Sequence, residues 1–156
     1  MRFVNINVTA TTDAEQINQN KVIAQSIEIP LAIQRADGSG CLIKSVALID
    51  ETNSTLECDV IFASASTAIT EDEGKAVGED VADLDSTINL FQGFVAIRSA
   101  DYTDLIDSRL ASKGGVDLVV SSAKSNTSIY CHVINRGSAV TFGETNDLKL
   151  RIGIQQ

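Results

Sequence analysis

The sequence has no tryptophan, one proline, one histidine, three cysteines and only 4% aromatic residues. A core must therefore be built from Ile, Val, Leu and Ala. Sugar-binding sandwiches usually rely on exposed aromatic platforms, so the scarcity of aromatic side chains argues against that function. No apolar run approaches the roughly 20 residues that cross a membrane as a helix. We therefore expect no membrane span.

Basic residues are also scarce. The chain carries 12 Lys and Arg against 21 Asp and Glu, a formal net charge of −9. The basic residues occur singly rather than in the stripe that a nucleic-acid-binding surface needs, which argues against binding to DNA or RNA. Residues 1–8 alternate and have no long apolar stretch, so we expect no secretory signal.

The three cysteines are Cys41, Cys58 and Cys131. Their number is odd, their spacings are long, and each lies in an apolar segment. No spacing matches a zinc site. We expect small buried hydrophobic side chains, and reduced thiols fit assembly in a cytoplasm.

Alternation of apolar and polar residues is the dominant pattern, and it is clearest at residues 26–63. It predicts three strands, at 26–35, 41–50 and 56–63, joined by turns rich in Gly, Asp, Asn and Ser. The middle strand is apolar on both faces. If simple hairpins joined it to both neighbours, the first strand would require one of its faces to be buried and the third strand the other face, which a single sheet over one core cannot satisfy. We therefore expect at least one connection to cross between two sheets, or a bulge to shift the register. Pro30, which has no N–H, predicts a sheet edge or a bulge.

The rest of the chain adds further strands and a few irregular connections. Residues 80–90 are compatible with a short helix capped by Asp80 or Asp83, and 101–110 with a short helix or an irregular loop. The fold class is all-β: a sandwich of about eight strands with one or two short helices in the connections. We expect one domain, 1–156, in which 1–25 form a strand and a polar arm and 26–156 form the sandwich. The further predicted strands are 3–9, 91–97, 116–122, 129–135, 140–142 and 148–154.

No catalytic residue is predicted. His132, the only histidine, directly follows Cys131, and neighbouring residues on a strand point to opposite faces. The two side chains therefore cannot form a nucleophile–base pair. We expect one of them to face inward and the other outward, and His132 to be structural.

No metal or cofactor site is predicted either. Five carboxylates at 71–80 offer oxygen ligands for calcium, but no calcium-loop spacing is present, and a solvated loop is the simpler interpretation. The same holds for Asp101, Asp104 and Asp107, which would share a face only in a helix. Gly38-Ser39-Gly40 and Gly114-Gly115 lack the lysine and the helix of a phosphate loop and are interpreted as turns. The five carboxylates are Glu71, Asp72, Glu73, Glu79 and Asp80.

Several segments, in order and spacing, resemble the small jelly-roll decoration, or cement, proteins on the heads of tailed bacteriophages. The likeness covers nearly the whole chain, least securely residues 1–25, and this chain departs from the family in a more charged insert at 71–75. The segments that carry it are Ile29-Pro30-Leu31-Ala32-Ile33, Cys41-Leu42-Ile43-Lys44-Ser45-Val46, Glu57-Cys58-Asp59-Val60-Ile61-Phe62, Asp80-Val81-Ala82-Asp83, Gly93-Phe94-Val95-Ala96-Ile97, Ala100-Asp101-Tyr102, Ala111-Ser112-Lys113, Ser128-Ile129-Tyr130, Arg136-Gly137 and Leu148-Lys149-Leu150-Arg151-Ile152-Gly153-Ile154.

The resemblance implies a jelly-roll sandwich without enzymatic activity, cofactor or small-molecule substrate. It implies a structural protein of the virion that is assembled in the host cytoplasm, binds the major capsid protein on the outer surface of the head and bridges capsid subunits, often as a homotrimer. We expect 1–25 and 64–80 to make intersubunit contacts, because neither has a core-forming pattern. The alternatives are a fibre or knob module for host adhesion and a structural protein of the tail or neck.

Overall fold

The computed structural model describes residues 2–10, 12, 16–52, 54–70, 80, 88–144 and 146–156. Within these residues the chain is almost entirely strand and connection, with two single-turn 3₁₀ helices. The elements are β1 (Phe3–Ala10), β2 (Gln16–Ile17), β3 (Val22–Ile29), β4 (Gly40–Asp50), β5 (Cys58–Ala63), η1 (Ile88–Leu90), β6 (Phe91–Ile97), η2 (Ser99–Asp101), β7 (Tyr102–Asp104), β8 (Arg109–Ser121), β9 (Ile129–Asn135), β10 (Val140–Thr141) and β11 (Leu148–Gln155).

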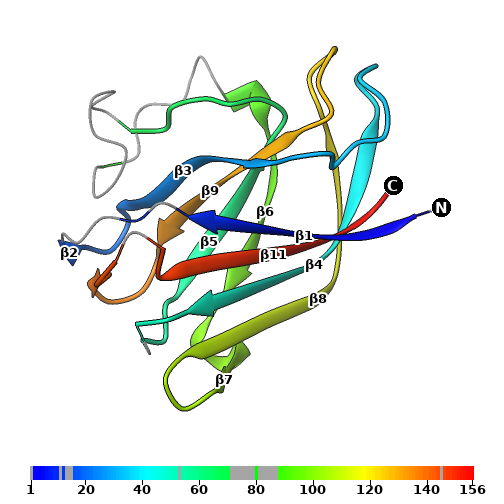
Figure 1. The fold of residues 1–156 in the computed structure, drawn as a ribbon. Coiled ribbons are helices and arrows are strands. Elements are labelled where there is room, and N and C mark those ends of the chain that lie inside the picture. The colour runs from blue at the N-terminus through cyan, green and yellow to red at the C-terminus, as the bar shows by residue number, and fades with distance from the viewer. Residues whose placement is uncertain are drawn as a thin grey trace.

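The long strands form two sheets that face each other (Figure 1). One sheet has the order β1-β11-β4-β8-β7 and the other the order β3-β9-β5-β6. Among the eight strands of six residues or more, the first pairs with the last, the second with the seventh, the third with the sixth and the fourth with the fifth, all antiparallel. This is the strand order of a jelly roll, a long antiparallel ribbon rolled into two layers. The prediction of an all-β sandwich of about eight strands is confirmed.

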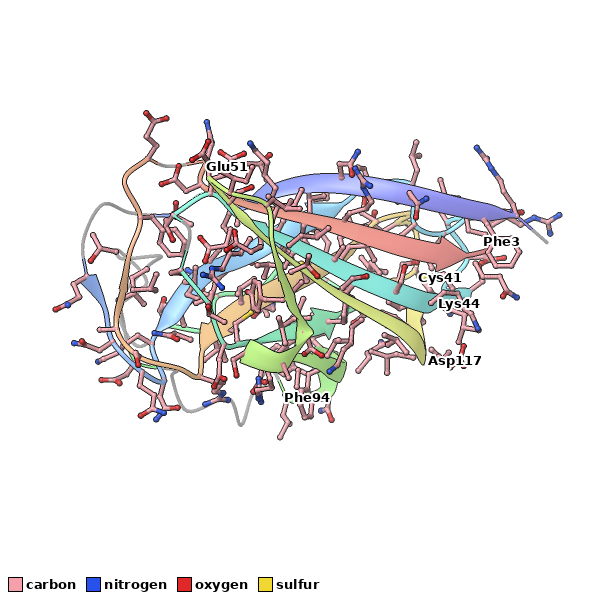
Figure 2. The ribbon with its side chains drawn as sticks, turned by 90° about the horizontal axis from the view of Figure 1, so that it is seen from below. Phe3, Cys41, Lys44, Glu51, Phe94 and Asp117 are labelled. Atoms are coloured by element: carbon pink, nitrogen blue, oxygen red, sulfur yellow. The ribbon has the colours of Figure 1, made fainter. Side chains whose placement is uncertain are left out.

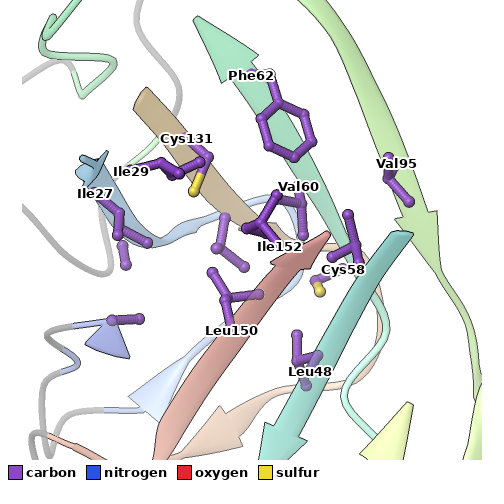
Figure 3. Close-up of a cluster of buried hydrophobic side chains, with 14 of the residues drawn as sticks. Ile27, Ile29, Leu48, Cys58, Val60, Phe62, Val95, Cys131, Leu150 and Ile152 are labelled. Atoms are coloured by element: carbon purple, nitrogen blue, oxygen red, sulfur yellow. The ribbon is translucent and has the colours of Figure 1, made fainter. Parts of the chain in front are cut away.

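The core fills the space between the two sheets (Figure 3). It consists mainly of aliphatic side chains from alternate positions of the strands, as the composition requires. Val60 and Phe62 of β5 face Leu150 and Ile152 of β11, and all four are almost completely buried. The thiols of all three cysteines are free and buried, which confirms their interpretation as small hydrophobic side chains.

The first of the three strands predicted within residues 26–63 is displaced from its predicted bounds. β3 begins at Val22 and ends at Ile29, directly before Pro30, whereas the prediction extended from 26 to 35. Leu31 follows in a left-handed conformation with a φ of 54° and is 72% exposed. The chain thus turns at Pro30, and the alternation at 31–33 that looked like strand belongs to a connection.

The structure explains in two ways why residues 41–50, which lie in β4, are apolar on both faces. β3 and β5 belong to one sheet and β4 to the other, so both connections cross between the sheets. In addition, Lys44 is an extra residue relative to β11, and three residues of β8, 115–117, lie opposite it. Cys41 and Ile43 face the core before this bulge, and Val46 and Leu48 face it afterwards. Both predicted explanations, crossing and bulge, are correct.

The N-terminal region is built into the sandwich. β1 is an edge strand that pairs with β11 over its whole length, and the backbones of Arg2 and Gln156 exchange two hydrogen bonds at 2.8 and 3.1 Å. Beyond β1, Ile17 is fully buried and β2 pairs with β10. The proposed boundary between residues 25 and 26 lies inside β3.

Other connections differ from the expectations in detail. Of the predicted helix at 80–90, residues 81–87 lie outside the described residues, and Ile88–Leu90 form a 3₁₀ turn. Residues 101–110 were predicted as a short helix or an irregular loop, but β7 and the start of β8 pair there as a hairpin. Gly114-Gly115, predicted as a turn, lies inside β8, where an irregularity in the pairing with β4 accommodates it.

Candidate functional site

The outer face of the five-stranded sheet is the most distinctive surface of the protein. On β1, β11, β4 and β8 the side chains that point away from the core, apart from Lys44 and Asp117 between the first two rows, line up in four cross-strand rows of four residues each. We call these sixteen residues the outer face. The rows are Phe3–Gln155–Leu42–Val119, Asn5–Gly153–Ser45–Gly114, Asn7–Arg151–Ala47–Ser112 and Thr9–Lys149–Ile49–Leu110.

The outer face contains no carboxylate, although the chain has 21 acidic residues. Its only charged members are Lys149 and Arg151. Arg151 donates from Nε to Oδ1 of Asn7 at 2.9 Å, and Lys149 pairs with Glu51 just beyond the end of β4. In a protein with a net charge of −9, this face is locally positive. A neutral or acidic partner surface is therefore favoured there over a basic one.

The first and last rows of the outer face contain apolar side chains, and the second row contains only small ones. Phe3 and Val119 in the first row are 66% and 68% exposed, and the last row contains Ile49 and Leu110. The second row carries Asn, Gly, Ser and Gly. A side chain on Gly153 would collide with the hydroxyl of Ser45, so the centre of the sheet stays flat.

One ion pair lies at the bulge, between the first and second rows of the outer face. Lys44 contacts Asp117, the only carboxylate adjoining the four rows on β8. Asp117 itself has a φ of 51°, at the irregularity where β8 passes Lys44. Figure 2 shows Phe3, Lys44 and Asp117 toward one end of the sheet and Glu51 at the other. Each of the two carboxylates nearest the rows is thus paired with a lysine, Asp117 with Lys44 and Glu51 with Lys149.

His132 is completely buried, which corrects the expectation that one member of the Cys131–His132 pair would face outward. Cys131 faces the main core, and His132 faces the other side of its sheet, beside the smaller apolar cluster of Val22, Ile69 and Ile134. Nδ1 accepts a hydrogen bond from the backbone N–H of Ser26 at 3.1 Å, whereas Nε2 has no partner among the described residues. The Phe91 ring packs edge-on against the imidazole, with 5.7 Å between centroids.

The environment of His132 is that of a structural residue. Burial lowers its pKa to about 4, so the imidazole is neutral at pH 7. Burial also raises the pKa of the Cys131 thiol to about 12, which leaves it protonated. The two side chains lie on opposite faces of β9, as the alternation predicts, and form no nucleophile–base pair.

The acidic residues singled out in the sequence do not come together where the structure describes them. Asp80 pairs with Lys21 at 2.7 Å, and residues 71–79 lie outside the described residues. Asp101 accepts two hydrogen bonds from Lys113, and Asp104 lies 3.9 Å from Arg109. In the described part of the chain, no group of three or more His, Cys, Asp or Glu side chains is placed to hold a metal ion.

The most organised charge cluster is structural in its contacts. Asp59, 8% exposed, accepts hydrogen bonds from Arg98 at 2.8 Å and from Arg136 at 2.7 Å. The guanidinium of Arg98 also donates to two backbone carbonyls, and that of Arg136 to the side chain of Asn20. This cluster joins the ends of β5, β6 and β9. Each carboxylate oxygen of Asp59 thus accepts a hydrogen bond from one arginine.

Two of the surface hollows share Arg136 as a lining residue. One, of about 620 Å³, lies between residues 54–57 and the turn at 136–140. The other, of about 450 Å³, lies over the four-stranded sheet and is bordered by Ile61, Phe91 and Arg136 among others. Neither contains a described cysteine or histidine as a lining residue. Gly38-Ser39-Gly40 is a turn in which Ser39 N–H donates to Asp37 at 2.9 Å, as predicted.

Sequence reasoning missed the outer face because its residues are far apart along the chain. The signal was present in each strand as the polar half of the alternation. Assembling it requires the order β1-β11-β4-β8 and the register across the Lys44 bulge. No helix in the described part of the chain is long and apolar enough to span a membrane. Comparison with known proteins finds no match among family models or curated protein sequences.

Proposed function

We propose that this protein is a non-enzymatic decoration, or cement, protein on the outer surface of a bacteriophage head, where it binds the major capsid protein as a homotrimer and bridges capsid subunits. The observation that carries the proposal is the outer face, whose four rows contain no carboxylate in an otherwise acidic protein and whose neighbouring Asp117 is paired with Lys44. The resemblance of the sequence to head decoration proteins supports it. The residues proposed to contact the capsid are those of the outer face, and the proposal requires no cofactor.

The physical basis is selective binding to the assembled shell. A protein that binds only where neighbouring capsid subunits meet stabilises that state by its binding free energy. Symmetric binding through several copies adds avidity to individually modest contacts. A rigid two-layer sandwich suits this role, because an ordered surface loses little conformational entropy when it binds.

The outer face also changes which contacts we assign to the N-terminal region. β1 contributes one quarter of the four rows and closes one edge of the sheet. Deleting residues 1–20 would therefore remove an edge strand and the buried Ile17 as well as any capsid contact. Point substitutions on the outer face are the better test, because they leave the backbone pairing in place.

The direct test locates the chain on virions of the phage that encodes it. Antibodies against the purified protein should label the head in electron micrographs, and size-exclusion chromatography with light scattering should report three copies per particle. Label on the fibres would favour host adhesion, and label on the tail or neck a structural role there. Either result would overturn the proposal.

A pair of variants tests the surface. Ser112 lies in the third row, is exposed and has no described side-chain hydrogen bond, so Ser112→Glu adds a carboxylate to the outer face alone. Ser138→Glu adds the same charge at an exposed turn outside the outer face. We expect Ser112→Glu to weaken binding to heads at least tenfold and Ser138→Glu to leave it unchanged. Equal binding by both variants would show that the outer face does not contact the head.

A further inference from the structure

The hairpin between β7 and β8 ends in a pair of exposed aliphatic side chains, Leu105 and Ile106. They are 48% and 85% exposed, and no other large hydrophobic residue among those described is more exposed than Ile106. Burying so much apolar surface is favourable whenever a partner offers a matching cavity. We call Leu105 and Ile106 the hairpin tip.

The backbone at the hairpin tip is in a conformation that disfavours isoleucine. Ile106 has a φ of 81°, in the left-handed region where Gly and Asn are common and a β-branched residue is an outlier. Its N–H donates to Oδ1 of Asp104 at 2.9 Å, and the N–H of Leu105 donates to the carbonyl of Ser108 at the same distance. These bonds would form equally well with glycine at position 106. The side chain of Ile106 is therefore not explained by the local fold.

The base of the hairpin is fixed to the sandwich on both sides. The hydroxyl of Tyr102 donates to the carbonyl of Leu56 at 2.6 Å. Asp101 accepts from Lys113 at 2.6 and 2.8 Å and from the N–H of Arg98 at 2.8 Å. The hairpin tip thus projects from an ordered support, which reduces the entropy lost when it binds.

The hairpin tip is continuous with the outer face and has a defined charge pattern. β7 extends the five-stranded sheet, and Thr103 pairs with Leu110, which continues the fourth row of the outer face toward the tip. Asp104 and Asp107 flank the aliphatic pair in sequence. The side chain of Asp104 is 62% exposed and lies 3.9 Å from the guanidinium of Arg109, so the two carboxylates and this arginine give the tip a net negative charge. An apolar pair between carboxylates complements an apolar pocket with a basic rim.

We infer that the hairpin tip is an anchor that inserts Leu105 and Ile106 into an apolar pocket with a basic rim on the protein shell that the outer face contacts. This inference rests on the proposed function and adds to it the position and chemistry of one contact. Anchors of this kind are a few buried side chains that dominate the affinity of a much larger interface.

The test uses heads of the encoding phage assembled without this protein, and measures binding of the purified full chain by cosedimentation. Ile106→Leu keeps an aliphatic side chain and should bind within about twofold of the wild type. Ile106→Asn suits the left-handed backbone but is polar, and should bind at least tenfold more weakly while its melting temperature does not fall. Asp107→Lys should bind several-fold more weakly, and the difference should shrink at high salt.

The outcomes separate the anchor from the proposed function. If the wild type binds heads and Ser112→Glu weakens that binding, but Ile106→Asn binds as well as Ile106→Leu, the function stands and the anchor is overturned. If Asp107→Lys binds more tightly than the wild type, the basic rim is wrong. If the wild-type protein does not bind heads, both proposals fail.

Discussion

Replacing Ile106 with glycine is expected to stabilise the protein, although it removes a large hydrophobic side chain. A left-handed conformation costs a residue with a Cβ about 1–2 kcal/mol, and a β-branched side chain belongs at the upper end of this range. Glycine avoids that cost but adds about 0.5–1 kcal/mol of conformational entropy to the unfolded chain. Since Ile106 is 85% exposed, little buried area is lost. The net gain is about 1 kcal/mol.

The expected change is measurable by thermal or urea denaturation. Unfolding entropy is about 2.1 cal/mol/K per residue, or roughly 0.33 kcal/mol/K for a chain of 156 residues. A gain of about 1 kcal/mol therefore raises the melting temperature by about 3 °C. Leu31, with a φ of 54° and 72% exposure, should respond to glycine in the same direction.

Ser108 provides the matched control within the same hairpin. It is absent from the described residues with positive φ, so Ser108→Gly adds only unfolded-state entropy and should lower the melting temperature by about 1–3 °C. If Ile106→Gly destabilised the protein as much as Ser108→Gly does, the Ile106 side chain would be part of the fold. The argument that the hairpin tip serves binding would then lose its foundation.

Two further predictions concern buried polar groups. Because the pKa of His132 is lowered to about 4 from an ordinary value near 6.5, the unfolded state binds its proton first as the pH falls. The free energy of unfolding should therefore decrease between about pH 6.5 and pH 4, by up to about 3 kcal/mol. Urea midpoints of His132→Gln should show a smaller decrease, and an equal one would refute the assignment. Asp59→Asn should lower the free energy of unfolding in urea by about 1–2 kcal/mol, because Arg98 and Arg136 lose the carboxylate they pair with. The loss is no larger because both arginines are over a third exposed and stay hydrated. An unchanged free energy of unfolding in Asp59→Asn would contradict this.

The strands that could be predicted from the sequence are those whose alternation is uninterrupted and ends at turn residues. Residues 91–97 and 129–135 match β6 and β9 in full. The predicted bounds of β3 were displaced because Gln25 and Ser26 in the middle of the strand mask the alternation. Ser26 has a φ of 50° at an irregularity in the pairing with β9. Period-two patterns cannot reveal a position where the period itself is broken.

The sequence predicted only part of the sheet topology. The two apolar faces of residues 41–50 correctly predicted a crossing or a bulge, because a single register could not satisfy both neighbours. The order of strands in each sheet depends on pairings between residues more than 100 positions apart, such as Phe3 with Gln155. Nothing local encodes that separation. The burial of His132 likewise depends on segments outside β9 that cover its sheet.

The hairpin tip was invisible to sequence reasoning for a different reason. The spacing of Asp101, Asp104 and Asp107 suggested a helical face, whereas Asp101 ends a 3₁₀ turn, Asp104 caps the hairpin turn and Asp107 lies in the loop. The apolar pair between the last two aspartates looked like part of a packed segment. Only the backbone conformation of Ile106 and its exposure show that it faces solvent.

The absence of carboxylates from the outer face has an internal comparison in the second sheet. Strands in general disfavour Asp and, less strongly, Glu and Lys, and this preference alone would make any outward-facing row poor in acid. The outward positions of β3 and β5 include Glu28 and Asp59, while the four rows of the outer face include Lys149 and Arg151 and no acid. The one outward-facing carboxylate of β8, Asp117, lies between the first two rows and is paired with Lys44. Strand propensity acts on both sheets alike, so it does not account for this difference in charge. The difference is expected if the outer face meets a partner whose own surface is neutral or acidic.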